Sequence, residues 1–165
     1  MVDEYFERIK AGYIQGDARG LFETVLAVAE DINRDQAFAL LERCVIEKRL
    51  AWAKHHLADF ERTGDPVFDG YRLFYEIYLN VSVPEDGKIV AQKADKMVMR
   101  WWNPCPTLDA CQQLGLDTRE ICRKVYCRPV QDLIQKLDPR LKFTRNYAAI
   151  RPYSPYCEEI IYLED

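Results

Sequence analysis

The sequence contains very few of two residue types that often carry chemistry. Serine occurs only as Ser82 and Ser154, and histidine only as His55 and His56. Two serines argue against a serine-nucleophile enzyme, which needs a serine beside a base. Two adjacent histidines exclude a histidine-rich metal site.

Long apolar runs are also missing. No segment approaches the roughly 18 consecutive apolar residues of a membrane span, and the acidic start Met-Val-Asp-Glu has no apolar centre like that of a secretory signal. We therefore expect a cytoplasmic protein with no membrane partner. Disulfides are rare in that compartment, so the six cysteines become candidates for metal binding or catalysis.

The chain has enough apolar material for a folded domain. Its 165 residues are 48% hydrophobic and 12% aromatic, which fits one domain with a substantial core. The net charge is −4, with 10 basic and 15 acidic residues in 1–84 and 13 basic and 12 acidic residues in 85–165. Neither half has the positive charge of a nucleic-acid-binding protein, so no nucleic-acid partner is expected.

Hydrophobic periodicity predicts helices in the first half. Asn33 and Gln36 form a capping box that begins the longest periodic stretch, which runs to about Arg62. Asp65-Pro66 begins another helix, because proline is favoured at the first helical position.

Alternating side chains predict strands in the second half, with short helices between them. These strands are expected at residues 88–94, 96–102, 141–147 and 157–163. The predicted fold is a single α+β domain over 1–165. Its N-terminal helical half (1–84) forms a layer packed on a small antiparallel meander sheet with inserted helices (85–165).

Cys105 is the leading candidate for a reactive group. It lies in Asn-Pro-Cys-Pro-Thr, just before a predicted helix, where free amides and the helix dipole favour an anion. Residues 96–157 carry 11 Lys and Arg against 5 Asp and Glu. A positive neighbourhood stabilises a thiolate and attracts an anionic substrate, so we expect a lowered pKa at Cys105.

The cysteines of the last third also suggest an alternative site. They are spaced Cys-x5-Cys-x10-Cys-x4-Cys-x29-Cys, with none of the Cys-x2-Cys pairs of common zinc and ferredoxin sites. Some of them could still converge in space. The alternative prediction is therefore zinc or an iron–sulfur cluster held by Cys105, Cys111, Cys122 and Cys157, whereas the leading prediction needs no cofactor.

Three polar residues interrupt the apolar side of the long helix. Glu42, Arg49 and His56 are spaced by seven and fall near the middle of the apolar arc. Buried charges are costly unless they are paired, so the stripe indicates an internal network or a polar cavity. His56 could act there as a general base. The alternative is that these side chains reach solvent at a loose interface.

Arginines beside aromatic residues supply candidates for binding a carboxylate. Arg100-Trp101-Trp102, Arg145-Asn146-Tyr147 and Arg151-Pro152-Tyr153 all lie in predicted strands or turns. Arginine binds carboxylates through paired hydrogen bonds, although the same residues could form surface cross-strand pairs.

The second half resembles a known family. The segments that carry the resemblance are RWWNPCPTLDACQQLGL from Arg100, Ile121-Cys122-Arg123, Asp138 to Phe143 and Tyr156 to Ile161. Together they resemble the L-2-amino-thiazoline-4-carboxylic acid hydrolase-like family over residues 96–163. The resemblance implies a helical first half, a Cys-Pro turn after a strand, a late cysteine opening the last strand, and a cysteine-lined pocket. Cys105, Cys111, Cys122 and Cys157 carry over by position.

These observations predict a cysteine-dependent hydrolase of a small carboxylated ring or amide. Cys105 is the expected nucleophile, with Cys157 and His56 as further catalytic residues. The expected substrate-binding residues are Glu42, Arg49, Arg100 and Arg151. A metal or iron–sulfur protein and a non-catalytic small-molecule sensor are the alternatives. The expected partner is a small anionic molecule, and the sequence leaves open whether the chain forms a homo-oligomer.

Overall fold

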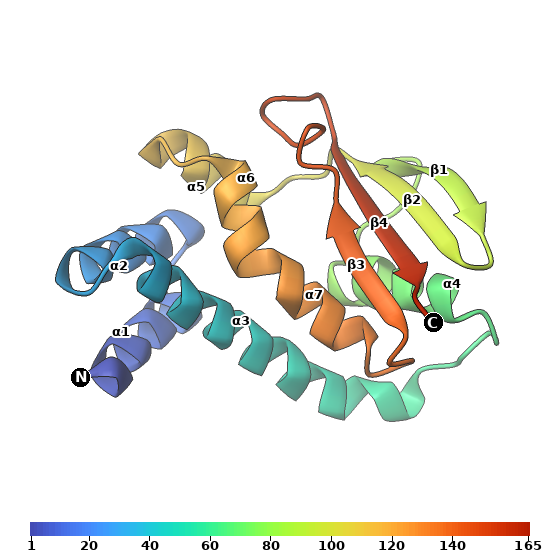
Figure 1. The fold of residues 1–165 in the computed structure, drawn as a ribbon, viewed down its shortest axis with the longest axis horizontal. Coiled ribbons are helices and arrows are strands. Elements are labelled where there is room, and N and C mark those ends of the chain that lie inside the picture. The colour runs from blue at the N-terminus through green and yellow to red at the C-terminus, as the bar shows by residue number, and fades with distance from the viewer.

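The computed structural model describes residues 1–165 as a row of helices that ends on a small sheet (Figure 1). The elements are α1 (Val2–Gln15), α2 (Ala18–Asp31), α3 (Arg34–His56), the 3-10 turn η1 (Leu57–Asp59), α4 (Pro66–Tyr71), the π-helical η2 (Arg72–Tyr78), β1 (Gly87–Lys93), β2 (Lys96–Trp101), α5 (Pro106–Leu114), α6 (Thr118–Ile121), the π-helical η3 (Cys122–Tyr126), α7 (Cys127–Ile134), β3 (Leu141–Arg145) and β4 (Cys157–Leu163). The predicted α+β class is confirmed. None of the helices combines the length and apolar composition that a bilayer crossing requires.

The predicted helix starts are confirmed by their capping contacts. Asn33 accepts a hydrogen bond from the backbone nitrogen of Gln36 over 2.8 Å, and Asp65 accepts one from Phe68 over 3.1 Å. These side chains satisfy amide groups that have no partner inside the helix. The helix that begins after Asn33 is shorter than predicted. It ends at His56 and continues only as the single turn η1.

Pro129 lies just after an irregular stretch of helix. The chain is π-helical over η3 and becomes α-helical from Cys127. A proline ring crowds the carbonyl four residues earlier and has no N–H to donate to it, so regular α-helix is disfavoured immediately before Pro129.

The sheet is antiparallel throughout, but its strand order is β1-β2-β4-β3. A simple meander would place β3 beside β2, so that part of the expectation is wrong. Residues 102–140 leave the sheet to form α5, α6, η3 and α7, and the chain returns as β3 at the outer edge. The connection over residues 146–156 then brings β4 back into the gap beside β2, where each of its edges finds a strand partner.

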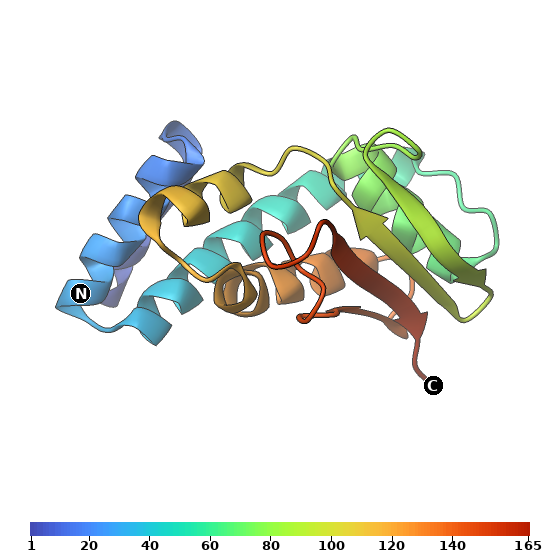
Figure 2. The ribbon, with the colours of Figure 1, turned by 90° about the horizontal axis from the view of Figure 1, so that it is seen from above.

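Two hydrophobic cores lie along α3, which runs through the length of the molecule (Figures 1 and 2). Val45 belongs to the core that α3 forms with α1, α2, α5 and η3. Ala53 belongs to the other core, which α3 forms with α4, η2, α7 and the sheet. Arg49 lies between them on the same helical face, four residues from each. The two cores therefore meet at a charged side chain.

Candidate functional site

A cavity of about 490 Å³ lies beside this junction. Its walls come from α3, η2, the end of β2, the turn before α5, η3, β3 and β4. The volume is within the range of about 300–1,000 Å³ that is common for small-molecule sites. Half of the lining residues are hydrophobic, with three cysteines among them, and the others include three arginines.

The sheet forms one wall of the cavity. Glu159 pairs with Met99 on β2 and with Arg145 on β3, so these three side chains share one face of the sheet. Further along β4 that face is apolar and buried, as at Ile161. Cys157 lies two residues before Glu159 on the same face. The inward face of the sheet is thus apolar at Ile161 and becomes polar toward the start of β4, where it lines the cavity.

Arg145 and Glu159 form a buried ion pair at this wall. Their Nε and Oε1 atoms are 3.5 Å apart, and their side chains are only 8% and 12% exposed. Burial alone would lower the pKa of Arg145, but Glu159 acts with the nearby Cys122, Tyr75 and Tyr147 to outweigh that effect, and the pKa is raised. Tyr75 donates a hydrogen bond to Glu159 over 2.5 Å, and its burial raises its pKa well above the ordinary value. Arg145 and Glu159 therefore neutralise each other.

Cys157 is held by Arg151. Its Sγ accepts hydrogen bonds from the backbone nitrogen of Arg151 over 3.4 Å and from Nε over 3.3 Å. Arg151 is fixed in turn, because its Nη1 donates to the backbone oxygen of Asn103 over 2.7 Å and its own carbonyl accepts from Thr118. Two donors, one of them cationic, are thus directed at a single sulfur.

Cys105 lies in the same cavity, as the N-cap of α5. Its Sγ accepts a hydrogen bond from the backbone nitrogen of Leu108 over 3.4 Å. Burial raises the pKa of Cys105, although that hydrogen bond and the charge of Arg151 act in the opposite direction. The expected lowered pKa is therefore wrong, because desolvation outweighs the helix start and the nearby positive charge. Cys105 is a protonated thiol at neutral pH.

Cys122 and Tyr126 complete the wall formed by η3. Burial raises the pKa of Cys122 to about 12 and that of Tyr126 to about 12, so both groups stay protonated. The backbone oxygen of Cys122 accepts a hydrogen bond from Nη1 of Arg145 over 3.2 Å. The π-helical turn is thereby tied to the sheet across the cavity.

Arg49 is the one lining arginine without an acidic or hydrogen-bonding partner. It is only 7% exposed, and no protein acceptor lies within hydrogen-bond distance of its Nε or Nη1. Its guanidinium carbon lies 5.2 Å from the ring centroids of both Phe74 and Tyr78. These cation–π contacts orient the group, but they do not replace the hydrogen bonds that a buried charge requires.

The scan of family models, the search of curated proteins and the search of solved structures each found no match. The candidate site therefore rests on its own geometry.

Several residues predicted for one site do meet in this cavity. They are Arg49, Cys105, Arg151 and Cys157. Arg100 does not join them, because it lies on the opposite face of β2. There it forms an ion pair with Glu158 over 2.8 Å and covers the ring of Tyr156.

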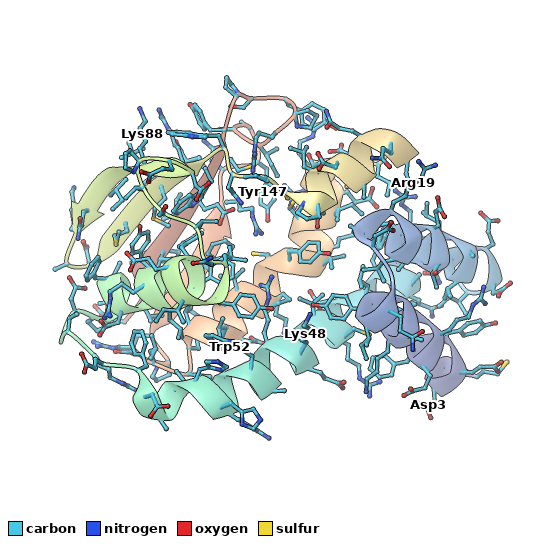
Figure 3. The ribbon with its side chains drawn as sticks, turned by 180° about the vertical axis from the view of Figure 1, so that it is seen from behind. Asp3, Arg19, Lys48, Trp52, Lys88 and Tyr147 are labelled. Carbon is cyan, nitrogen blue, oxygen red and sulfur yellow. The ribbon has the colours of Figure 1, made fainter.

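The expectation that Glu42 and His56 line the cavity is wrong. Glu42 lies in a shallow surface depression with Asp35, and burial raises its pKa. His56 is exposed at the end of α3 and stacks on Trp52 with ring centroids 4.2 Å apart. Trp52 itself points from α3 toward α4 and η2 (Figure 3). The three polar residues share a helical face, but α3 has different neighbours at each of them.

The alternative metal site does not form from the predicted cysteines. Cys111 is completely buried in the core of α1, α2 and α3, and it does not line the cavity with Cys105, Cys122 and Cys157. No group of three or more His, Cys, Asp or Glu side chains is arranged to hold a metal ion. Cys111 faces inward because it belongs to the apolar side of α5 beside Ala110.

Arg145 was one of several candidate arginines but was not chosen for the site, and Glu159, Tyr75 and Tyr126 were not predicted as site residues. Arg145 and Glu159 could have been found from the strand alternation. Leu141, Phe143 and Arg145 form one series, and Cys157, Glu159 and Ile161 form another. Arg145 ends the first series and Glu159 stands between Cys157 and Ile161 in the second, so the two charges predict a polar end to the buried face. The two tyrosines come from π-helical turns, for which the helical period gives no such signal.

Proposed function

We propose that this protein is a cysteine-dependent hydrolase that cleaves a carbon–nitrogen bond in a small carboxylated molecule. The supporting observation is that an unpaired, buried Arg49 lines the same cavity as Cys157 and Cys105. A buried guanidinium without an acceptor is costly in the free protein, and a carboxylate supplies two acceptor oxygens and the missing negative charge. The substrate class agrees with the family that the second half resembles.

Cys157 is the proposed nucleophile. A thiolate is the reactive form of cysteine, and donors directed at the sulfur stabilise it. Arg151 directs its backbone and side-chain N–H groups at this sulfur. Cys105, the nucleophile expected from the sequence, instead keeps its proton at neutral pH. Cys105 therefore serves as the proton donor.

The reaction proceeds in two steps. The Cys157 thiolate adds to the electrophilic carbon of the C–N bond, the bond breaks, and the leaving nitrogen takes the proton of the Cys105 thiol. With an amide substrate, the acyl group remains on Cys157 as a thioester. Water then attacks the thioester, and the Cys105 thiolate accepts the water's proton as the acid leaves. Both cysteines return to their starting forms.

The test is turnover of L-2-amino-thiazoline-4-carboxylate and N-acetylglycine by the full chain, measured by mass spectrometry of products and of the intact protein. Cys157→Ser is expected to abolish turnover and the acyl adduct. Cys105→Ser is expected to lower kcat by about 10²–10⁴-fold, the range for a lost general acid. Cys127→Ser is the matched control, because this half-buried thiol lies outside the cavity.

Full turnover by Cys157→Ser would overturn the nucleophile assignment. Carboxylate binding without any turnover would overturn the hydrolase and favour a small-molecule sensor. If neither probe binds, the proposed function is wrong.

A further inference from the structure

We infer that the ligand of this cavity is a monocarboxylate that carries a flat, apolar ring, such as an N-aroyl amino acid, rather than a small polar carboxylate or a dianion. This inference rests on the proposed function and specifies its substrate class. It is carried by the charges, the unsatisfied donors and the aromatic wall of the cavity.

The charges that line the cavity fit one negative group. The positive residues are Arg49, Arg145 and Arg151, and the acidic residues are Asp86 and Glu159. Arg145 is neutralised by Glu159, and Arg151 is bound to Cys157 and Asn103. Only Arg49 lacks a partner. A second negative charge on the ligand would find no unpaired cation and would meet the carboxylate of Asp86, which is unfavourable.

The unsatisfied polar atoms of the cavity are all hydrogen-bond donors. They are Nε and Nη1 of Arg49 and Nε1 of Trp101. Acceptor oxygens at two places on a ligand would suit these donors, because Arg49 belongs to α3 and Trp101 to β2. A carboxylate and an amide carbonyl in one molecule would satisfy both.

Aromatic side chains surround the remaining space. Phe74 lies beside the Arg49 guanidinium, and Tyr75 stacks on Trp101 with ring centroids 4.6 Å apart. Phe74, Tyr75 and Trp101 are all buried and line the cavity. A wall of this kind favours a flat apolar group, because burial removes it from water and aromatic rings pack well against one another. The volume of about 490 Å³ leaves room for a ring in addition to the carboxylate and amide.

The test is calorimetric titration of four probes into the Cys157→Ser variant, which lacks the proposed nucleophilic sulfur and therefore does not consume the probes. N-benzoylglycine and N-acetylglycine differ only in the ring, and we expect the first to bind about tenfold to a hundredfold more tightly. N-benzoylglycinamide has no charge, and N-benzoylaspartate has two, so both are expected to bind more weakly than N-benzoylglycine.

Two further variants separate the contribution of the carboxylate from that of the ring. Arg49→Gln is expected to weaken N-benzoylglycine by at least about thirtyfold. Phe74→Leu keeps an apolar side chain but removes a ring, so it is expected to weaken N-benzoylglycine more than N-acetylglycine, which loses only the ring's contact with the Arg49 guanidinium.

Equal affinities for N-benzoylglycine and N-acetylglycine would show that the cavity does not recognise a ring, and would leave the carboxylate site intact. Tighter binding of N-benzoylaspartate would overturn the preference for a single charge. If no carboxylate binds, or if N-benzoylglycinamide binds as tightly as N-benzoylglycine, the proposed function fails as well.

Discussion

Nε of Arg151 lies 3.3 Å from Sγ of Cys157, and the backbone nitrogen of Arg151 donates to the same sulfur. Both donors come from one residue, so the sulfur and its cation are positioned together by the connection that leads into β4. Thr118 and Asn103 hold Arg151 from two other segments. The sulfur is therefore stabilised by a contact that three separate parts of the chain keep in place.

Cys157 is predicted to be the thiol that iodoacetamide modifies first at neutral pH. Cys105, Cys44, Cys111 and Cys122 all have pKa values raised by burial, which leaves little reactive thiolate at those positions. Arg151→Met removes the side-chain donor, so we expect it to slow the labelling of Cys157. Peptide mass spectrometry over time measures both effects.

Arg119→Met is the control for that experiment, because Arg119 pairs with Asp117 on the surface and does not line the cavity. The cysteines of Arg119→Met should be labelled at the same rates as those of the protein without a substitution. Earlier modification of Cys105 than of Cys157 would contradict the assignment of the nucleophile.

Arg49 and Arg145 are predicted to affect stability very differently when each is replaced by methionine. Arg145→Met leaves the buried carboxylate of Glu159 without its cation, which should lower the free energy of unfolding by about 3–5 kcal/mol. Arg49→Met leaves no acidic residue without its cation, and it removes an unpaired buried charge. We expect it to change the free energy of unfolding by less than about 1 kcal/mol, or to raise it. Urea unfolding without ligand measures both values.

A double replacement provides the control, since Arg145→Met together with Glu159→Gln should recover part of the loss. An equally large loss in Arg49→Met would show that Arg49 has a structural partner, and the ligand-binding assignment would then be wrong.

Much of the fold could be predicted from local sequence signals. The caps at Asn33, Asp65 and Asp117 act within three residues, and Gly115 ends α5 with a φ of 67° that favours glycine. Such signals do not depend on the rest of the molecule. The strand order does depend on it, because alternation identifies the buried face of β4 without identifying its neighbours. The placement of β4 between β2 and β3 could not be read locally.

Site residues could be predicted from the sequence where they stand at the start of a helix or strand. Cys105 precedes α5, and Cys157 begins β4. The helical stripe was less informative. Residues spaced by seven drift by about 20° on a straight helix, and α3 passes from one core to the other between Val45 and Ala53. Arg49 therefore meets the cavity, whereas His56 lies beyond it.

Stability is predicted to fall as the pH rises above about 9. Burial raises the pKa of Cys111 from an ordinary 9.0 to about 12 and that of Cys44 to about 11. Above pH 9 the unfolded chain releases these protons while the folded chain keeps them, so alkali favours unfolding. Each thiol contributes a slope of about 1.4 kcal/mol per pH unit between its two pKa values. Denaturant unfolding from pH 7 to 11 measures the total slope.

Cys111→Ala should reduce the alkaline slope by the contribution of one thiol, even though the variant is less stable at every pH. Val125→Ala truncates the same core without removing a titrating group, and its slope should be unchanged. An unchanged slope in Cys111→Ala would mean that this thiol already ionises in the folded protein.

Replacement of His56 by alanine is predicted to leave ligand binding and turnover within about twofold of the unmodified protein. The ring is exposed, stacks on Trp52 and shares a hydrogen bond between its Nδ1 and the Trp52 carbonyl, all within one turn of α3. It faces no residue of the cavity, so it cannot exchange a proton with a substrate held between Arg49 and Cys157. Its loss should change the free energy of unfolding by no more than about 0.5 kcal/mol, as is usual for a surface site. Arg49→Gln, compared in the same assay, should lose binding. A large loss of kcat in His56→Ala with unchanged stability would instead show that α3 brings this histidine to the substrate.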